Sequence, residues 1–246
     1  FGTQKLEDET KKLFPQARIA RLDRDTVKGR ESFEEVHRKM NLGEIDILIG
    51  TQMITKGHDF PNVTLVGVLY ADLSLHIPDF RSAERSFQLL TQVAGRAGRG
   101  KVPGLVIIQS LLSGHYVFDF VKEHDFTGFS EKELALREKL KYPPFTRMVS
   151  IEIESEHEQA GEKFANSLHK TLVRITNKIS GIEVLGPARA SLYQINNRFR
   201  RHLILRSYDY RKLHSALRRL YETPEIKKFS NSKVKLILDV DPVSLM

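Results

Sequence analysis

The sequence of 246 residues predicts an α/β protein: a parallel-sheet domain covered by helices, then a smaller α+β domain. Three observations support this prediction. Helical and strand patterns alternate through residues 3–110, whereas residues 149–155 (VSIEIES) alternate strictly between apolar and polar side chains. Between the two patterns, Pro143-Pro144 ends a helix and starts an extended segment. We therefore expect a first domain at 1–115, a helical connection at 116–145 and a second domain at 146–246.

The first domain is expected to alternate helices with short apolar strands. Helices are predicted at 3–14, 29–40 and 81–94, and strands at 17–22, 45–49, 63–70 and 105–110. Right-handed crossovers place the carboxyl ends of parallel strands along one edge. That edge should carry Asp23–Thr26, Gly50–Gln52 and Ala71-Asp72.

The rest of the chain predicts a different plan. Ser130 and Glu133 have the spacing of a capping box, which is expected to open a helix. Beyond the prolines, the predicted elements are a strand at 149–155, a helix at 158–180, strands at 182–185, 189–193 and 199–207, a helix at 210–221 and a strand at 233–240. We interpret this as the β-α-β-β-α-β order of a ferredoxin-like plan.

Composition limits the function classes. No apolar run approaches the ~20 residues that span a bilayer, and the start of the chain has no signal-peptide pattern. The net charge of +8 favours a polyanionic partner, nucleic acid above all, although a merely basic soluble protein is an alternative. With no cysteine and no paired histidines at helical spacing, we expect no metal in this chain. The absence of disulfides fits a cytoplasmic protein.

The stretch QVAGRAGR, residues 92–99, is a candidate phosphate site. Arg96 and Arg99 are three residues apart, on one side of a helix or its closing turn. The neighbouring glycines let the backbone approach another surface, and guanidinium groups suit phosphate oxygens. The alternative is a helix end at which arginines offset the dipole and glycine caps the helix.

The stretch IDILIGTQMITKGHDFP, residues 45–61, is a second candidate. Thr51 and Gln52 follow a buried strand, where ligands sit in parallel sheets, and precede an expected helix start. Their side chains could donate to a backbone phosphate of nucleic acid. Asp59 could serve a ligand or act only as a local loop acceptor.

These two stretches occur in an order that resembles motifs V and VI of superfamily 2 helicases. GTQMITKGHDFPNVTLVGVLYAD and PDFRSAERSFQLLTQVAGRAGRG most closely resemble the primosomal replication-restart DNA helicases. The resemblance is strong over residues 2–115 and extends through YPPF (142–145), VLGPA (184–188) and LDVDP (238–242). It implies that the first domain is the second RecA-like lobe of a helicase.

The resemblance also implies roles for single residues. Arg99 would be the arginine finger of ATP hydrolysis, Arg96 a companion phosphate contact and Gln92 a helper at the nucleotide edge. Lys56, Gly57 and Asp59 match the nucleotide-proximal positions of motif V. The region of Thr51 and Gln52 would bind the tracking DNA strand.

ATP and Mg²⁺ are expected only in the full-length protein. Gly95, Gly100 and Lys101 have the P-loop spacing, but Val102 stands where Ser or Thr must hold Mg²⁺. The resemblance implies that a missing upstream lobe completes the ATP site, and that zinc belongs to an upstream cysteine-rich module. This fragment alone is therefore expected to be inactive and without a cofactor.

DNA contacts are expected in both domains. Arg81 and Arg85, one turn apart, could meet DNA or pair with Glu84. In the second domain, basic residues crowd two adjacent elements with only Asp209 opposing them: Arg198, Arg200, Arg201, Arg206, Arg211, Lys212, Arg218 and Arg219. Interleaved aromatics suit forked or single-stranded DNA, and we expect contacts from Arg198, Arg200, Arg201 and Arg211. The alternative is a surface that docks on an acidic partner.

The sequence thus predicts the C-terminal half of an ATP-dependent DNA helicase of replication restart. By resemblance, its partners are forked or single-stranded DNA, single-stranded-DNA-binding protein and primosome proteins, in the bacterial cytoplasm at the nucleoid. Two alternatives stay open: a non-enzymatic basic nucleic-acid-binding module and an RNA helicase lobe.

Overall fold

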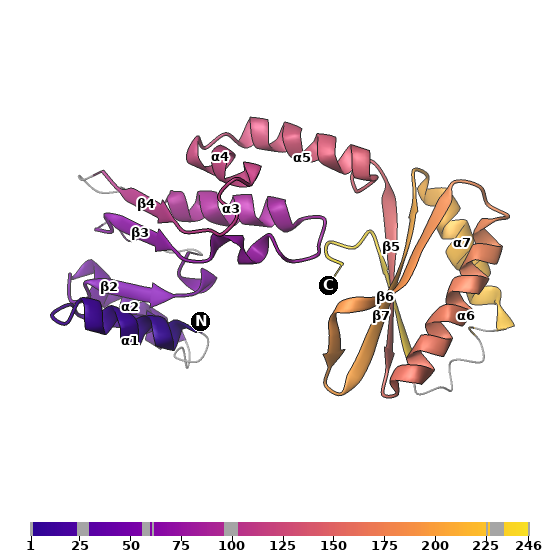
Figure 1. Ribbon diagram of the computed structural model, residues 1–246, viewed down its shortest axis with the longest axis horizontal. Coiled ribbons are helices and arrows are strands. Elements are labelled where there is room, and N and C mark those ends of the chain that lie inside the picture. The colour runs from indigo at the N-terminus through magenta and orange to yellow at the C-terminus, as the bar shows by residue number, and fades with distance from the viewer. Residues whose placement is uncertain are drawn as a thin grey trace. The chain divides into compact units, whose positions relative to one another are not determined.

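The computed structural model describes residues 2–23, 30–55, 60, 62–95, 103–224, 226 and 234–245. The chain forms two compact units. The first unit contains Phe1–His76 and Ala83–Phe126, and the second contains Ile77–Ser82 and Thr127–Met246. The predicted fold class, α/β with a parallel-sheet lobe followed by a smaller α+β domain, is confirmed (Figure 1).

The first unit alternates helices and parallel strands. Its elements are α1 (Thr3–Leu13), β1 (Ile19–Leu22), α2 (Arg30–Asn41), β2 (Ile47–Gly50), η1 (Gln52–Thr55), β3 (Leu65–Val68), η2 (Ala71–Ser74), α3 (Ser82–Ala94), β4 (Leu105–Ile108) and α4 (Tyr116–Lys122). β1 pairs with β2 and β3 pairs with β4, both in parallel. Among the described residues, the expected single sheet is thus two separate pairs of four-residue strands.

Among the helices described in the first unit, α3 has the most buried residues. Phe87, Leu90 and Val93 are buried at helical spacing, as the sequence predicts. The ring of Phe87 lies 6.3 Å from that of Phe126. Because its apolar side is packed, α3 presents its polar side chains on the opposite side.

The connection between the two predicted domains is helical, but the capping-box prediction is wrong. Helix α5 spans Phe126–Leu140, so Ser130 lies inside the helix and cannot cap it. Glu133 is buried and accepts a hydrogen bond from Arg137 Nε at 2.9 Å, one turn further on. The helix ends before Pro143-Pro144, which has a cis peptide bond, and an extended strand starts at Arg147.

The second unit has the predicted ferredoxin-like plan. Its elements are β5 (Arg147–Ser155), α6 (Glu158–Thr176), β6 (Ile182–Ile195), β7 (Arg198–Ser207), α7 (Tyr210–Glu222) and β8 (Val234–Val240). The strands form an antiparallel sheet in the order β6-β7-β5-β8. The two predicted strands at 182–185 and 189–193 are one strand, β6, with irregular pairing near Gly186-Pro187 and after Arg189.

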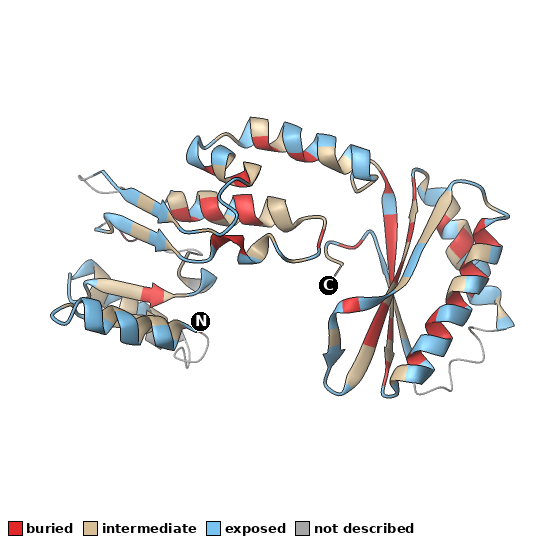
Figure 2. Cartoon of the chain, in the orientation of Figure 1, coloured by how far each residue is buried: buried red, intermediate tan, exposed pale blue. Residues whose placement is uncertain are grey.

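Helices α6 and α7 cover one face of this sheet. The core joins alternate residues of β5 and β7 to the apolar sides of α6 and α7: Val149, Ile151, Ile153, Leu203, Leu205, Phe164, Leu168, Leu172, Leu213, Ala216 and Leu220. Figure 2 shows this burial along β5 and α6. The even-numbered residues of β7, Arg200 to Arg206, therefore lie on the other face of the sheet.

Candidate nucleotide and nucleic-acid contacts

The chain packs closely around Gly50, the last residue of β2. Gly50 is paired with Leu22 of β1. A Cβ atom at position 50 would lie 2.3 Å from the Leu22 carbonyl oxygen and 2.4 Å from Ile54 Cδ1. Glycine is therefore required where η1 folds back toward the end of β1.

Thr51 and Gln52 are both exposed directly after this glycine, as a strand-end site requires. The helix start expected here is a single 3-10 turn, Gln52–Thr55, in which Ile54 N donates to Thr51 O at 3.1 Å. Any phosphate contact must therefore come from the Thr51 and Gln52 side chains or from this short turn. Lys56, Gly57 and Asp59, which are expected to lie near the nucleotide, are outside the described residues.

The acidic residues at the predicted sheet edge hold local structure. Asp23 is buried and accepts a hydrogen bond from Thr3 Oγ1 at 2.5 Å. Asp72 is buried and accepts from the backbone N–H of Leu111 at 2.9 Å, the main reason that the pKa of its carboxyl lies below the usual value. Both carboxylates are thus engaged by neighbouring elements of the first unit.

Helix α3 ends within the candidate phosphate stretch, residues 92–99. Gln92 is exposed on the last turn, on the side away from Leu90 and Val93. The helix ends at Ala94, and Gly95 N donates to Thr91 O at 3.0 Å. Gln92 is therefore exposed at the end of α3, four positions before Arg96 in the sequence. Arg96 and Arg99 themselves lie outside the described part of the chain.

Arg81 and Arg85, at the start of α3, are both half-buried. The backbone N–H of Arg81 donates to Asp79 Oδ1 at 2.9 Å. Neither side chain projects freely from the helix, so the structure leaves these residues less open to DNA than the sequence pattern suggests.

The basic strand of the second unit is opposed by glutamates, so the expectation that only Asp209 opposes it is wrong. Arg200 binds Glu152 through Nε–Oε1 at 2.8 Å and Nη2–Oε2 at 2.5 Å. Arg201 Nη2 lies 3.0 Å from Glu162 Oε2. The other pairs are Arg198 with Glu156 at 2.9 Å and Arg206 with Glu183 at 2.5 Å.

The four arginines of this unit that are predicted to contact DNA differ in how exposed they are. Arg200 and Arg201 are each 9% exposed, and their guanidinium groups are committed to ion pairs. Arg198 is half-buried, while Arg211 is exposed with its guanidinium carbon 5.8 Å from the Tyr210 ring centre. Of the four, Arg211 presents the most accessible charge.

The half-buried Glu152 has two basic partners on β7. Besides Arg200, its Oε2 atom lies 2.9 Å from His202 Nε2. Burial raises the pKa of the Glu152 carboxyl, but hydrogen bonds from Arg200 and His202 outweigh burial and hold this pKa below its usual value. Glu152 is thus held as a carboxylate between β5 and β7.

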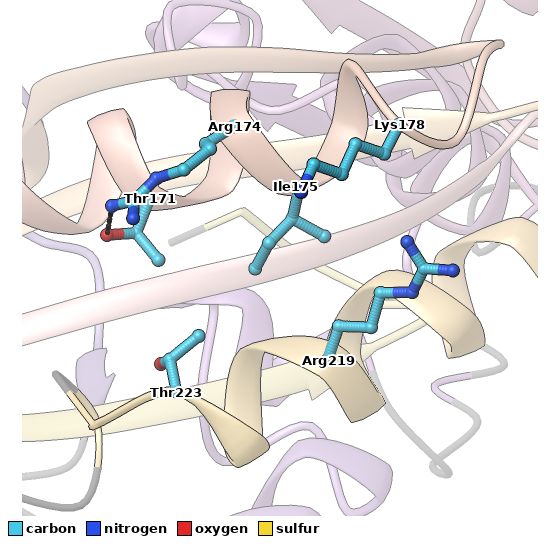
Figure 3. Close-up of a pocket in the computed structure, with 6 residues that line it drawn as sticks. All are labelled: Thr171, Arg174, Ile175, Lys178, Arg219 and Thr223. Carbon is cyan, nitrogen blue, oxygen red and sulfur yellow. Dashed lines mark hydrogen bonds between the residues drawn. The ribbon is translucent and has the colours of Figure 1, made fainter.

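A basic groove lies between α6 and the end of α7 (Figure 3). We use this name for a cavity of about 170 Å³ lined by Thr171, Arg174, Ile175, Lys178, Arg219 and Thr223. Among the described residues, no carboxylate pairs with Lys178 or Arg219, whereas the adjacent Arg218 lies 3.5 Å from Glu222. Thr223 Oγ1 donates to Leu220 O at 2.6 Å, and Thr171 Oγ1 accepts from Arg174 Nη2 at 3.3 Å. The cations of the groove, rather than its hydroxyl groups, therefore suit a phosphate oxygen.

The sequence interpretation missed Arg174 and Lys178. Thr171, Arg174, Ile175 and Lys178 have the i, i+3, i+4, i+7 spacing of one helix face, a signal that was available. Arg219, however, is more than 40 positions away from both, so only the packing of α6 against α7 reveals the groove.

In the described ranges, no group of three His, Asp or Glu side chains is placed to bind a metal ion. No described helix is both long enough and apolar enough to cross a bilayer.

Two family models match the chain. The model described as "Helicase conserved C-terminal domain" matches residues 2–101. The model described as "Primosomal protein N C-terminal domain" matches residues 138–243. The first match contains both candidate phosphate stretches, and the second contains the whole ferredoxin-like domain up to β8.

Relatives in several bacteria align along the whole chain. It is 39% identical over 245 residues to Replication restart protein PriA of Bacillus subtilis, covering 100% of this chain and 30% of the relative. The protein of the same name in Synechocystis sp. is 40% identical over 244 residues, 99% of this chain and 28% of the relative. That of Haemophilus influenzae is 37% identical over 245 residues, 100% of this chain and 33% of the relative. The chain therefore spans about a third of the length of these relatives.

Proposed function

Because this chain belongs to the PriA family of replication restart proteins and corresponds to their C-terminal part, we propose that it is the C-terminal half of an ATP-dependent DNA helicase. One observation carries the proposal: within the helicase match, α3 ends at Ala94 with Gln92 exposed, directly before the Gly95-Arg96-x-Gly98-Arg99 stretch. A helix that ends beside an exposed polar side chain can present following arginines to a bound phosphate.

The nucleotide-facing role belongs to Gln92, Arg96 and Arg99, with Lys56, Gly57 and Asp59 beside them. ATP with Mg²⁺ supplies a γ-phosphoryl group whose oxygens gain negative charge during transfer. The guanidinium of Arg99 stabilises that charge, Arg96 holds a second phosphate contact and Gln92 orients the nucleotide edge. The residues that bind Mg²⁺ lie outside this chain in our proposal, so the fragment alone is inactive, and zinc belongs to an upstream module.

The DNA-facing role is divided between two regions. Thr51 and Gln52, both exposed, contact the tracking strand at the first unit. In the second unit, Arg211, Arg198 and the basic groove contact backbone phosphates of forked or single-stranded DNA. Arg200 and Arg201 are structural instead, because both are buried: the ion pair of Arg200 joins β7 to β5, and that of Arg201 joins β7 to α6.

In this division of labour, residues 1–115 form the motor lobe, 116–145 a connection and 146–246 the DNA-holding domain. Single-stranded-DNA-binding protein and other primosome components are the proposed protein partners, at the nucleoid.

The test compares this proposal with a generic basic module. Fluorescence anisotropy of the 246-residue chain is measured on forked, single-stranded and duplex DNA over a range of salt concentrations. We expect tighter binding to forks with a shallow dependence on salt. Equal affinity for all three DNAs with a steep salt dependence would favour the non-enzymatic module, and preference for an RNA competitor would favour the RNA helicase lobe.

A further inference from the structure

The segment Ile77–Ser82, here called the anchor segment, has an unusual place in the fold. It belongs to the second compact unit, although the residues on both sides of it, up to His76 and from Ala83, belong to the first. The proposed motor chemistry gives this segment no role. Its contacts within the second unit therefore need their own explanation.

Asp79 ties the anchor segment to the last described residues of the chain. This residue is buried, and its Oδ2 accepts hydrogen bonds from Ser244 Oγ at 2.6 Å and from the backbone N–H of Leu245 at 3.2 Å. Its Oδ1 accepts from the backbone N–H of Arg81 at 2.9 Å. One carboxylate thus joins residues that are 165 positions apart.

Phe80 adds an aromatic contact beside Asp79. Its ring stacks on that of Tyr142 with a centroid distance of 5.6 Å and an interplanar angle of 12°. The guanidinium carbon of Arg137 lies 5.5 Å from the Phe80 ring centre, and Arg137 is itself held by the buried Glu133. Residues from α5 and from the loop before β5 therefore fix the ring of Phe80.

These contacts act on the start of α3. The backbone N–H of Ser82, the first residue of the helix, donates to Asp79 O at 3.0 Å. The helix has 13 residues and ends at Ala94, so that Gln92 lies in its last turn and Gly95 follows it directly. Since a packed helix moves as a rigid element, a shift at Ser82 is carried to its nucleotide-facing end.

We propose that the anchor segment couples the C-terminal domain to the ATP site, with Asp79 and Phe80 as positioning residues. When the C-terminal domain holds DNA, the anchor segment fixes the position of Ser82 at the start of α3. The helix then fixes the position of Gln92 and of the arginines that follow it. This inference rests on the proposed helicase function, and it assigns Tyr142, Arg137 and Ser244 to coupling rather than to catalysis or DNA binding.

The experiment uses the full-length protein with Tyr142→Ala and, separately, Ser244→Ala. ATP hydrolysis is measured with and without forked DNA, together with DNA affinity and the melting temperature. We expect Tyr142→Ala to lower the DNA stimulation of hydrolysis by between about fivefold and 100-fold, with unstimulated rate and DNA affinity kept within about twofold. Ser244→Ala, which removes one hydrogen bond, should lower it in the same sense but less.

Two controls separate coupling from a structural role. Tyr142→Phe keeps the stacked ring and should keep the stimulation, and Tyr221→Ala removes an exposed tyrosine of α7 and should change nothing. The inference is overturned if Tyr142→Ala and Ser244→Ala both keep full stimulation, or if unstimulated and stimulated rates fall together with the folded fraction. A wild-type protein whose hydrolysis does not respond to DNA would overturn the proposed function itself, and the coupling with it.

Discussion

Arg200 on β7 binds Glu152 on β5 through two hydrogen bonds, Nε–Oε1 at 2.8 Å and Nη2–Oε2 at 2.5 Å, on the sheet face that α6 and α7 leave uncovered. This pair changes the interpretation of the basic strand. An arginine that is 9% exposed and satisfied by a carboxylate has little left to offer a phosphate. Arg211 and the basic groove present charges that are more accessible than that of Arg200.

The first prediction is that Arg200→Ala destabilises the protein. The substitution leaves the half-buried Glu152 without its main partner, which costs about 1.5–3 kcal/mol in the free energy of unfolding. Urea unfolding followed by circular dichroism measures this cost. Arg218→Ala, which breaks an exposed pair with Glu222, is the control and should cost less than about 1 kcal/mol. Unchanged stability together with weaker DNA binding would instead make Arg200 a DNA ligand.

The second prediction concerns the pH dependence of stability. Because the pKa of Glu152 is lower in the folded protein than its usual 4.5, the unfolded chain takes up the proton first as the pH falls. The stabilising contribution is thus complete above about pH 4.5 and is lost as the pH falls through the folded pKa. Glu152→Gln should flatten this part of the curve of unfolding free energy against pH. If the unfolding free energy of Glu152→Gln fell with pH in parallel with that of the wild type down to about pH 3, this prediction would be contradicted.

The third prediction concerns Gly50. Alanine there brings Cβ within 2.3 Å of the Leu22 carbonyl oxygen, and although the Ile54 side chain can rotate away, a paired backbone cannot. We expect Gly50→Ala to lower the free energy of unfolding by about 1–3 kcal/mol and to reduce hydrogen-exchange protection in β1 and β2. Gly67→Ala, where a Cβ meets nothing within 4 Å, is the matched control. Equal stability of the two variants would argue against this explanation.

The fourth prediction tests the basic groove. Replacing Lys178 and Arg219 together with glutamine should weaken DNA binding and reduce the slope of log affinity against log salt by about 0.7 for each lost phosphate contact on single strands. The matched control is Arg218→Gln, next to Arg219 and paired with Glu222. If this control weakens binding as much as the double variant, general positive charge explains the effect and the groove does not.

Much of the fold could be predicted from local sequence patterns, because residues close together in the sequence decide whether a segment forms a strand or an amphipathic helix. The alternation in 149–155 and the apolar side of α6 gave the correct ferredoxin-like order. The capping box failed because the same spacing also occurs inside a helix. Asp125, a favoured N-cap residue, stands directly before α5 and was the better signal for its start.

The ion pairs and the groove could not be predicted in this way. Glu152 and Arg200 are 48 positions apart, and only the register of β5 against β7, with Glu152 opposite His202, brings them together. The same holds for Arg219 and Lys178, which line one groove only because α6 packs against α7. Charge counted along the sequence therefore overestimated the free positive charge of the strand.

The most direct measurement is ATP hydrolysis by the full-length protein, with Arg99 intact and with Arg99→Ala, alongside affinity for forked DNA. Arg38→Ala, at an exposed arginine of α2 paired with Glu35, is the control. An arginine finger predicts that DNA-stimulated hydrolysis falls by about 10³–10⁵ in Arg99→Ala while DNA affinity stays close to the wild-type value. Hydrolysis that hardly changes would contradict the account and reduce the stretch after α3 to an ordinary helix end.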